Sequence, residues 1–321
     1  MPKMNGLDTL KVIKQKYNIP VIMVSSVTRK GADITIKALE MGAVDWIQKP
    51  ENTFDSKVYE QLANELIQKV KLLAKPDGAT PAVDKHVPQV APAISHTTPV
   101  AIDDKDNMTS AAFTQFVLDS RWKPKGGGNV PFYLVAIGIS TGGPSALNQV
   151  VTQFPEDMNA AVLIVQHMPA TFTKVLADRL DNISKVKVKE AEENEVIKRG
   201  VVYIIPGDKH IRILDNDPNR LTIKLDHYSK VGGFRPSAEP LFYFVAEVAK
   251  KKAVGVIMTG MGGDGSDNLG LIKAYSGKTI AQDEASCVIF GMPKMAIMKG
   301  HVDTIVPLDK IVDKIKDYIV E

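Results

Sequence analysis

The sequence has a single cysteine, Cys287, in 321 residues, so an internal disulfide framework is excluded. Free thiols are typical of a reducing cytoplasm, and a lone cysteine most often packs as a small buried side chain. Long apolar runs are also missing, because none approaches the roughly 20 residues that a membrane-spanning helix needs. The N-terminus lacks the apolar stretch of a signal peptide. We therefore expect a cytoplasmic protein that does not insert into membranes.

The net charge of the chain is also small. The sequence has 40 basic and 37 acidic residues, which leave a formal charge of +3. The two signs are interleaved, and no basic stripe of the kind that binds nucleic acid is present, so nucleic acid is not an expected partner. Hydrophobic residues make up 44% of the chain and charged residues 24%, which is ordinary for a globular protein. The length is enough for about two domains.

The first predicted unit, residues 1–75, alternates between strands and helices. Apolar strand patterns at 20–24 and 43–47 are interleaved with helical patterns. This alternation predicts a parallel, doubly wound sheet. The helical patterns lie at 7–17, 32–41 and 54–73.

Three features of this unit resemble the second half of a response-regulator receiver domain. They are the opening Met-Pro-x-Met-Asn-Gly, Ser25 at the end of one strand, and Lys49 before a proline at the end of the next. The resemblance implies a receiver switch in which Ser25 and Lys49 contact a phosphorylated aspartate. That aspartate and the acidic metal ligands are absent. Either the sequence starts inside a longer protein, which we favour, or the switch has been lost. In both cases the flavodoxin-like strand order leaves the strand at 20–24 as an open edge.

Residues 76–130 have the composition of a flexible linker. Prolines at positions 76, 81, 88, 92 and 99 stand among Ala, Thr, Asp and Lys. Such a segment buries too little apolar surface to offset the entropy of ordering it. A short helix is expected at 111–118, and the Lys-Gly-Gly-Gly at 125–128 is typical of a flexible joint.

Residues 131–321 are predicted to form one larger α/β domain. An alternating segment at 221–225 follows Arg-Ile-Leu-Asp-Asn-Asp-Pro-Asn-Arg at 212–220. This combination predicts an antiparallel hairpin set into a parallel sheet. The fold class is therefore α/β, with a C-terminal, doubly wound, mainly parallel and Rossmann-like sheet after a partial flavodoxin-like receiver domain. Strands are expected at 134–138, 161–166, 186–190, 201–205, 254–259 and 280–282, and helices at 240–250 and 309–320.

Three residues with catalytic chemistry follow apolar strands of this domain, namely Ser140, His167 and Asp264. The carboxyl ends of parallel strands share one edge of a sheet, where ligand sites form. A serine needs a base to become a nucleophile, and the base needs a partner that fixes its tautomer. Each residue also has an ordinary alternative: Ser140 as a helix cap, His167 as a histidine at a strand end, and Asp264 as a turn residue among glycines.

The glycine-rich turn around Ser140 fits G-x-S-x-G, a short pattern that also occurs by chance. Two phosphate-binding alternatives fit worse. The turn has no G-x-G-x-x-G followed about 20 residues later by an acidic residue, and no Lys-Ser/Thr pair follows its glycines. The order Ser-His-Asp also differs from the Ser-Asp-His order of α/β-hydrolases.

Six motifs together resemble the catalytic domain of the chemotaxis protein-glutamate methylesterases, which are also protein-glutamine glutaminases. They are Gly-Ile-Ser-Thr-Gly-Gly-Pro at 138–144, Gln-His-Met at 166–168, Pro-Gly-Asp-x-His at 206–210, Phe-Arg-Pro-Ser at 234–237, Met-Thr-Gly-Met-Gly-x-Asp-Gly at 258–265 and Ala-Gln-Asp-Glu-x-Ser at 281–286.

The resemblance implies a serine hydrolase that demethylates glutamate γ-methyl esters and deamidates glutamines on methyl-accepting chemotaxis receptors, for sensory adaptation. Ser140 is then the nucleophile, His167 the general base and acid, and Asp264 the group that orients the imidazole, and no metal or organic cofactor is needed. A complete receiver domain would add a chemotaxis histidine kinase as a partner. The remaining implied site residues are Thr141, Gly142 and Met261, for the oxyanion, and Arg235, for the acidic receptor helix.

Several alternatives stay open. Arg235 has an ordinary role in a surface or inter-domain ion pair as its alternative. We expect His210, His227 and His301 to be structural or exposed. For the whole protein, the alternatives are a non-enzymatic adaptor for receptors or kinase and a serine esterase for small soluble substrates.

Overall fold

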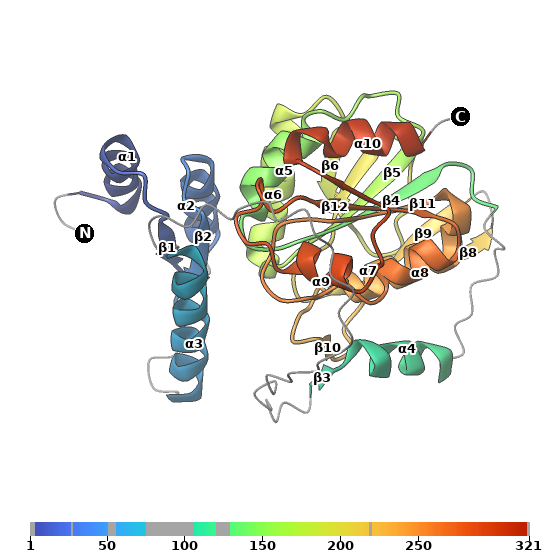
Figure 1. The fold of residues 1–321 in the computed structure, drawn as a ribbon, viewed down its shortest axis with the longest axis horizontal. Helices are drawn as coiled ribbons and strands as arrows, with labels where there is room; N and C mark the ends of the chain where they lie inside the picture. The colour runs from blue at the N-terminus through green and yellow to red at the C-terminus, as the bar shows by residue number, and fades with distance from the viewer. Residues whose placement is uncertain are drawn as a thin grey trace, which may run out of the picture.

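A computed structural model describes residues 4–26, 28–50, 56–74, 106–119, 129–217 and 220–319 (Figure 1). The C-terminal part contains a seven-stranded sheet between layers of helices, and the N-terminal part contains a two-stranded sheet with three helices. None of the helices in these ranges is long and apolar enough to cross a membrane.

The seven-stranded sheet is parallel throughout. Its first strand in the chain, β4, lies inside the sheet between β5 and β11. The chain builds outward from β4 on one side and then returns to the other, so the strand order reverses at β4, where α/β proteins form ligand sites. In sheet order the strands are β13 (Thr304–Val306), β12 (Lys278–Gln282), β11 (Ala253–Ile257), β4 (Tyr133–Ile139), β5 (Ala160–Gln166), β7 (Val201–Ile204) and β6 (Lys187–Glu190).

Helices cover both faces of this sheet, which confirms the predicted doubly wound architecture (Figure 1). Neighbouring residues of β4 point to opposite cores: Val135 belongs to one and Leu134 to the other. This explains why β4 is a continuous apolar run rather than an alternating one. One face carries α5 (Gly143–Val151), α6 (Ala170–Ile183) and α10 (Ile311–Tyr318), and the other carries α7 (Ala238–Ala249), α8 (Leu269–Ala274) and α9 (Met292–Met298), with short 3-10 helices at Lys250–Lys252 and Leu308–Lys310.

The predicted hairpin forms, but not within the parallel sheet. Strands β8 (His210–Asp217) and β9 (Arg220–Asp226) pair antiparallel in a sheet of their own. Their buried side chains, such as Ile213 and Ile223, share a core with residues of α7. The hairpin thus packs its apolar face on a helix instead of extending the sheet edge, and the prediction of its placement was wrong.

Part of the predicted flexible linker is a packed element. Strand β3 (Asn107–Met108) pairs in parallel with β10 (Lys230–Val231), and α4 (Ser110–Asp119) follows it. Phe113 of α4 is fully buried, with its ring 5.8 Å from that of Tyr228. The short helix expected at 111–118 is confirmed by α4, but residues 106–119 are packed and not flexible, because their apolar side chains offset the ordering entropy. The predicted linker residues 76–105 and 120–128 lie outside the described part of the chain.

The N-terminal part, residues 4–74, is called the receiver fragment below. Its strands β1 (Ile22–Ser25) and β2 (Asp45–Gln48) pair in parallel, and no other strand of the described residues pairs with β1. The fragment packs against the large domain through α2 and β2, and Trp46 stacks on Phe172 of α6 with ring centroids 4.2 Å apart. Its helices are α1 (Gly6–Lys16), α2 (Arg29–Glu40) and α3 (Ser56–Leu73).

Candidate active site

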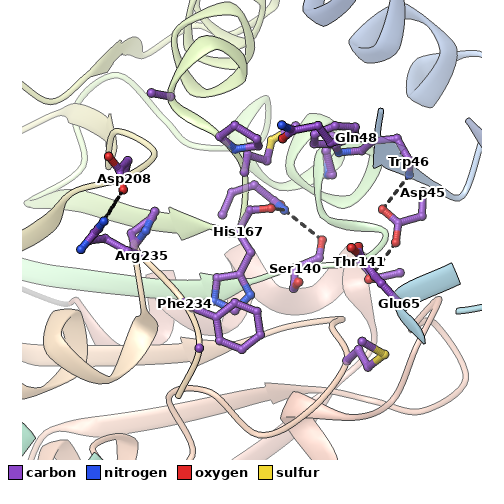
Figure 2. A pocket seen from close by; sticks show the side chains of 18 of the residues that line it. Asp45, Trp46, Gln48, Glu65, Ser140, Thr141, His167, Asp208, Phe234 and Arg235 are labelled. Carbon is purple, nitrogen blue, oxygen red and sulfur yellow. Dashed lines mark hydrogen bonds and ion pairs between the residues drawn. The ribbon is translucent and has the colours of Figure 1, made fainter. Parts of the chain in front are cut away.

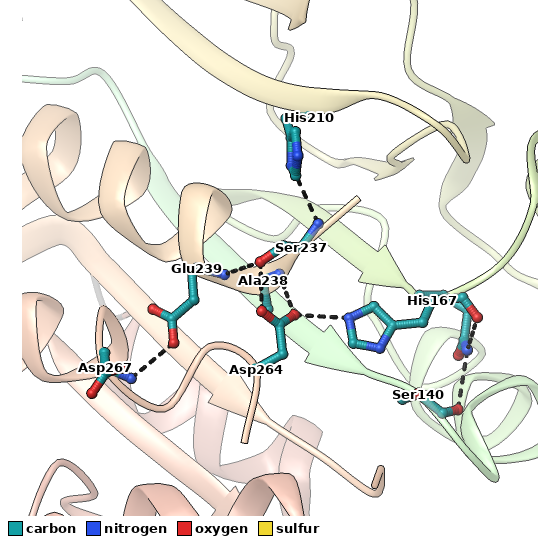
Figure 3. A network of polar contacts seen from close by, with 9 residues as sticks. Ser140, His167, His210, Ser237, Ala238, Glu239, Asp264 and Asp267 are labelled. Atoms are coloured by element: carbon teal, nitrogen blue, oxygen red, sulfur yellow. Dashed lines mark hydrogen bonds and ion pairs between the residues drawn. The ribbon is translucent and has the colours of Figure 1, made fainter. Parts of the chain in front are cut away.

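The structure brings Ser140, His167 and Asp264 together at the carboxyl edge of the seven-stranded sheet (Figure 3). Ser140 follows β4, and its N–H donates to the carbonyl of Thr259 beyond β11 at 3.0 Å. The N–H of His167, after β5, donates to the carbonyl of Ile139 at 3.2 Å. These cross-strand bonds bring the three strand ends into register, so residues far apart in sequence share one site.

The turn that carries Ser140 depends on glycine. Gly142 has a φ of +79°, in the left-handed region, and caps α5 at its N-terminus. Gly260 provides space on the other side, because a Cβ there would lie 2.8 Å from the Cβ of Ser140. These two positions leave the serine half-buried at the edge of the sheet, beside the first turn of α5.

His167 is held by two contacts. Its Nε2 lies 2.8 Å from Asp264 Oδ2, and its ring stacks on Phe234 with centroids 3.9 Å apart. Its other nitrogen, Nδ1, is buried and has no hydrogen-bond partner among the described residues. No hydrogen bond joins it to Ser140 in that part of the chain, but such bonds often tighten only when substrate binds. Because Nε2 is bound to Asp264, Nδ1 is the ring nitrogen available to accept the proton of the Ser140 hydroxyl.

Asp264 accepts three hydrogen bonds. Besides His167, the donors are the hydroxyl of Ser237 at 2.5 Å and the N–H of Ala238 at 2.6 Å. The Asp264 side chain is 1% exposed, so these donors replace water around the carboxylate. Ser237 and Ala238 stand at the N-terminus of α7, where the helix dipole also favours negative charge.

Backbone N–H groups near Ser140 can receive an oxyanion. No hydrogen bond among the described residues uses the N–H of Thr141, Gly142 or Met261. Thr141 and Gly142 begin the turn into α5, and Met261 follows β11 on the facing loop. Free N–H groups at a helix N-terminus stabilise negative charge. Thr141 and Met261 line the same cavity as Ser140, and the oxyanion role of the three residues stays a prediction.

A cavity of about 750 Å³ lies between this edge and the receiver fragment (Figure 2). Asp45 of β2 reaches across it and accepts a hydrogen bond from the Thr141 hydroxyl at 2.9 Å. Asp45 also forms a buried ion pair with Lys69 at 2.8 Å. Burial alone would lower the pKa of Lys69, but Asp45 and then Glu65 raise it above its usual value. The fragment therefore places an ion pair next to the nucleophile.

Arg235 lines the same cavity but is already engaged. Its guanidinium contacts Asp208 at 2.8 Å, the carbonyl of Tyr228 at 3.0 Å and, in the packed linker segment, Asp106 at 3.3 Å. The side chain is 13% exposed. In this structure Arg235 therefore makes the ion pairs that the sequence analysis gave as its alternative role.

The predicted receiver switch lies at the carboxyl ends of β1 and β2. The N–H of Lys49 donates to the carbonyl of Ser25 at 2.7 Å, and the Ser25 hydroxyl donates to the carbonyl of Gly31 at 3.2 Å. Neither residue lines the cavity beside Ser140. The described residues contain no cluster of acidic, histidine or cysteine side chains that could hold a metal ion.

The remaining histidines and the cysteine have ordinary environments. His210 is fully buried and stacks on Tyr228, and burial lowers its pKa to about 4. His227 is exposed, and His301 bonds the carbonyl of Ser266 at 2.7 Å. Cys287 is half-buried, and its surroundings raise its pKa to about 12, mainly through desolvation.

Sequence reasoning missed the residues that support these three side chains. Gln166 donates to the carbonyl of Ser140 at 3.0 Å. Ser237 and Phe234 contact Asp264 and His167, as described above. Ser237 did carry a signal, because a serine directly before a predicted helix is a typical N-cap. Gln166 and Phe234 carried none beyond their place in the motifs.

The parallel fold, the serine on its strand-to-helix turn and the histidine bound to a buried carboxylate define an α/β enzyme of the serine-hydrolase class. The chain belongs to the CheB methylesterase family, whose model matches residues 135–315. The response regulator receiver domain model matches residues 1–58.

Relatives match almost the whole chain. A protein-glutamate methylesterase/protein-glutamine glutaminase of Pyrococcus horikoshii is 42% identical over 312 residues, or 97% of this chain and 76% of that protein. The Bacillus subtilis protein of the same name is 40% identical, over 97% of this chain and 81% of that protein. The crystal structure of the Thermotoga maritima CheB methylesterase catalytic domain is similar, with a TM-score of 0.57 and 41% identity, and covers 59% of this chain and 99% of its own.

Proposed function

We propose that this protein hydrolyses glutamate γ-methyl esters, releasing methanol, and deamidates glutamines on methyl-accepting chemotaxis receptors in the cytoplasm. The observation that carries the proposal is the convergence of Ser140, His167 and Asp264 at one sheet edge. Family membership and the names of the relatives support the choice of ester and amide over other acyl substrates.

In the proposed reaction, Ser140 Oγ attacks the γ-carbonyl carbon while Nδ1 of His167 takes the hydroxyl proton. The imidazolium that forms is stabilised by Asp264, which already bonds Nε2 at 2.8 Å. The same proton then passes to the leaving methoxide, or to the leaving amine of a glutamine, and an acyl-enzyme remains. Water attacks this ester with His167 again as base, which frees the γ-carboxylate and restores Ser140.

The negative charge of the tetrahedral intermediate needs donors. The N–H groups of Thr141, Gly142 and Met261 are the proposed oxyanion donors, because none of them is used by another hydrogen bond of the described residues. A donor of this kind contributes about 3 kcal/mol to lowering the barrier in comparable sites.

The receiver fragment supports a regulatory partner. Its match to a receiver domain favours a chemotaxis histidine kinase as the upstream partner. Asp45 and its neighbours line the cavity beside Ser140, so the docked fragment limits the space available to a receptor helix. Arg235, released from Asp208 or Asp106, is the proposed contact for acidic residues of that helix.

The test is methanol release from methylated receptor cytoplasmic fragments. We expect Ser140→Ala to lose at least about 10⁴-fold in rate, as expected when a triad nucleophile is removed. Ser145→Ala is the matched control, because Ser145 is exposed in the first turn of α5, just after the turn that carries Ser140, and does not line the cavity. It should keep the wild-type rate.

Three other outcomes would contradict the proposal. Equal release by wild type and Ser140→Ala would make Ser140 a helix cap. No release by wild type, with intact receptor binding, would favour a non-enzymatic adaptor. Faster turnover of short soluble esters than of receptor would instead identify a small-molecule esterase.

A further inference from the structure

We propose that Ser237 is a positioning residue for this reaction, because its buried hydroxyl holds the Asp264 carboxylate in place against His167. The inference rests on the proposed function of the three site residues. Ser237 lies at the N-cap of α7, is 1% exposed and does not line the cavity. It therefore acts through Asp264 and not by contact with substrate.

The direction of the Ser237 hydroxyl proton follows from its neighbours. The N–H of Glu239 donates to Ser237 Oγ at 3.1 Å, so the oxygen already accepts one hydrogen bond. Asp264 Oδ1 lies 2.5 Å from the same oxygen, and a carboxylate can only accept. The hydroxyl proton must therefore point to Asp264 Oδ1. Figure 3 shows this chain of contacts from Glu239 through Ser237 to Asp264.

The two oxygens of Asp264 have separate tasks. Oδ1 is bound by Ser237, while Oδ2 accepts from Ala238 N–H and faces Nε2 of His167. A carboxylate pinned through both oxygens cannot rotate about its terminal bond. Without the Ser237 hydroxyl, Ala238 and His167 would share one oxygen and the other would be buried without a donor. Rotation would then weaken the bond to Nε2.

The N-terminus of α7 also binds the loop that carries Asp264 at its C-terminal end, near Asp267 and Asn268. The carboxyl oxygens of Glu239 accept from the N–H groups of Asp267 and Asn268 at 3.0 and 2.8 Å. The Asn268 side chain donates back to the Glu239 carbonyl at 3.2 Å. Because the Glu239 side chain fixes the loop through bonds that do not involve the Ser237 hydroxyl, loss of that hydroxyl should change the Asp264 side chain more than the backbone that carries it.

One further group faces Ser237. This group is His210, which is fully buried, and the backbone N–H of Ser237 lies 3.4 Å from its Nδ1. The titratable groups around Ser237 are thus Asp264, Glu239 and His210. His167 does not contact Ser237 but is hydrogen-bonded to Asp264. Among them only His167 lines the cavity, so an effect of Ser237 on turnover must pass through the Asp264–His167 pair.

The experiment compares Ser237→Ala with wild type in the full chain. We expect kcat for methanol release to fall about tenfold or more, as for loss of a hydrogen bond to a charged group, with KM changed less than twofold. The control is Thr279→Val. Thr279 is buried near the start of β12, away from the edge that carries Ser140. Its hydroxyl donates to the Asp303 carboxylate at 3.0 Å and accepts the backbone N–H of Asp303, so its removal is a matched change. This variant should keep both constants.

The second readout is the downfield proton resonance of His167 Nε2–H, which reports its bond to Asp264 whether or not substrate turns over. It should move in Ser237→Ala and stay in Thr279→Val. If Ser237→Ala does not fold, Ser237→Cys fills the space with a weak donor and should give the same changes. Wild-type kcat and an unmoved resonance would overturn the inference. An inactive wild type would refute the proposed function alone, while the resonance would still decide the role of Ser237.

Discussion

The catalytic region, which is the part from residue 129 to residue 319 with the seven-stranded sheet, and the receiver fragment are both parallel α/β structures, but they bury their strands very differently. Strand β5 is fully buried along its whole length, with helices on both faces. Strand β1 has no fully buried residue, and Val24 in it is 50% exposed. A parallel sheet is stable when both faces are covered and its edges are paired or protected. The catalytic region meets this condition by itself, whereas the fragment meets it only on the face that docks.

The face of the fragment that docks on the catalytic region is buried by several contacts. Residues of α2 such as Leu39 join the same core as α5 and α6. Trp46 stacks on Phe172, and Asp45 bonds Thr141. The fragment therefore buries this face against the surface that surrounds Ser140. We expect undocking to lower the stability of the fragment and to open the site.

The largest expected effect separates the two regions by core truncation. Ile164→Ala in β5 should lower the free energy of unfolding by about 2–5 kcal/mol, because Ile164 is fully buried and a cavity remains. Val24→Ala in β1 should cost less than about 0.5 kcal/mol, as expected for a surface change. Urea unfolding measures both. Equal losses would mean that Val24 is not the surface position that its exposure indicates.

The next effect tests the docking contact. Asp45→Ala leaves Lys69 as a buried charge without its main partner, which should cost the fragment about 3 kcal/mol. Amide exchange in α2 and β2 should accelerate, and resting methanol release should rise because Thr141 is freed. Glu65→Ala is the control, since the Glu65 side chain that pairs with Lys69 is 46% exposed. Unchanged exchange in Asp45→Ala would show that the ion pair does not hold the fragment.

A smaller effect comes from the contrast between two buried charged groups. Asp45 has Lys69 as a partner, whereas Glu239 has no cationic partner among the described residues, and burial, with Asp264 nearby, raises its pKa to about 8. A raised carboxyl pKa favours the protonated folded state. The stability it contributes is therefore present below about pH 4.5 and is lost as the pH rises to about 8.

We expect Glu239→Gln to flatten the dependence of stability on pH between these limits by about 1–3 kcal/mol, from the linkage between pKa and stability. The variant should also be less stable at low pH, because its amide meets the N–H of Asp267 or Asn268. Urea midpoints at pH 5.5 and 7.5 give the slope. A slope equal to that of wild type would show that Glu239 does not titrate in this range.

The sequence predicted the parts of the molecule that follow from local pattern and strand order. Continuous apolar runs identified β4 and β5, and the rule that parallel strands end at one sheet edge was enough to group Ser140, His167 and Asp264. The placement of the hairpin and the packing of α4 could not be predicted, because both depend on which apolar surface is left uncovered after the sheet has formed. Asp45 and Thr141 are 96 positions apart, and only docking of two units joins them.

The central claim is that Ser140 and His167 act as one unit, and a double-variant cycle tests it most directly. Methanol release would be measured for Ser140→Ala, His167→Ala and the double variant. Groups that act as a unit are strongly non-additive, so the double variant should be no slower than the slower single variant. If the two losses instead multiply, the two side chains contribute independently, and the account of a serine activated by His167 is wrong.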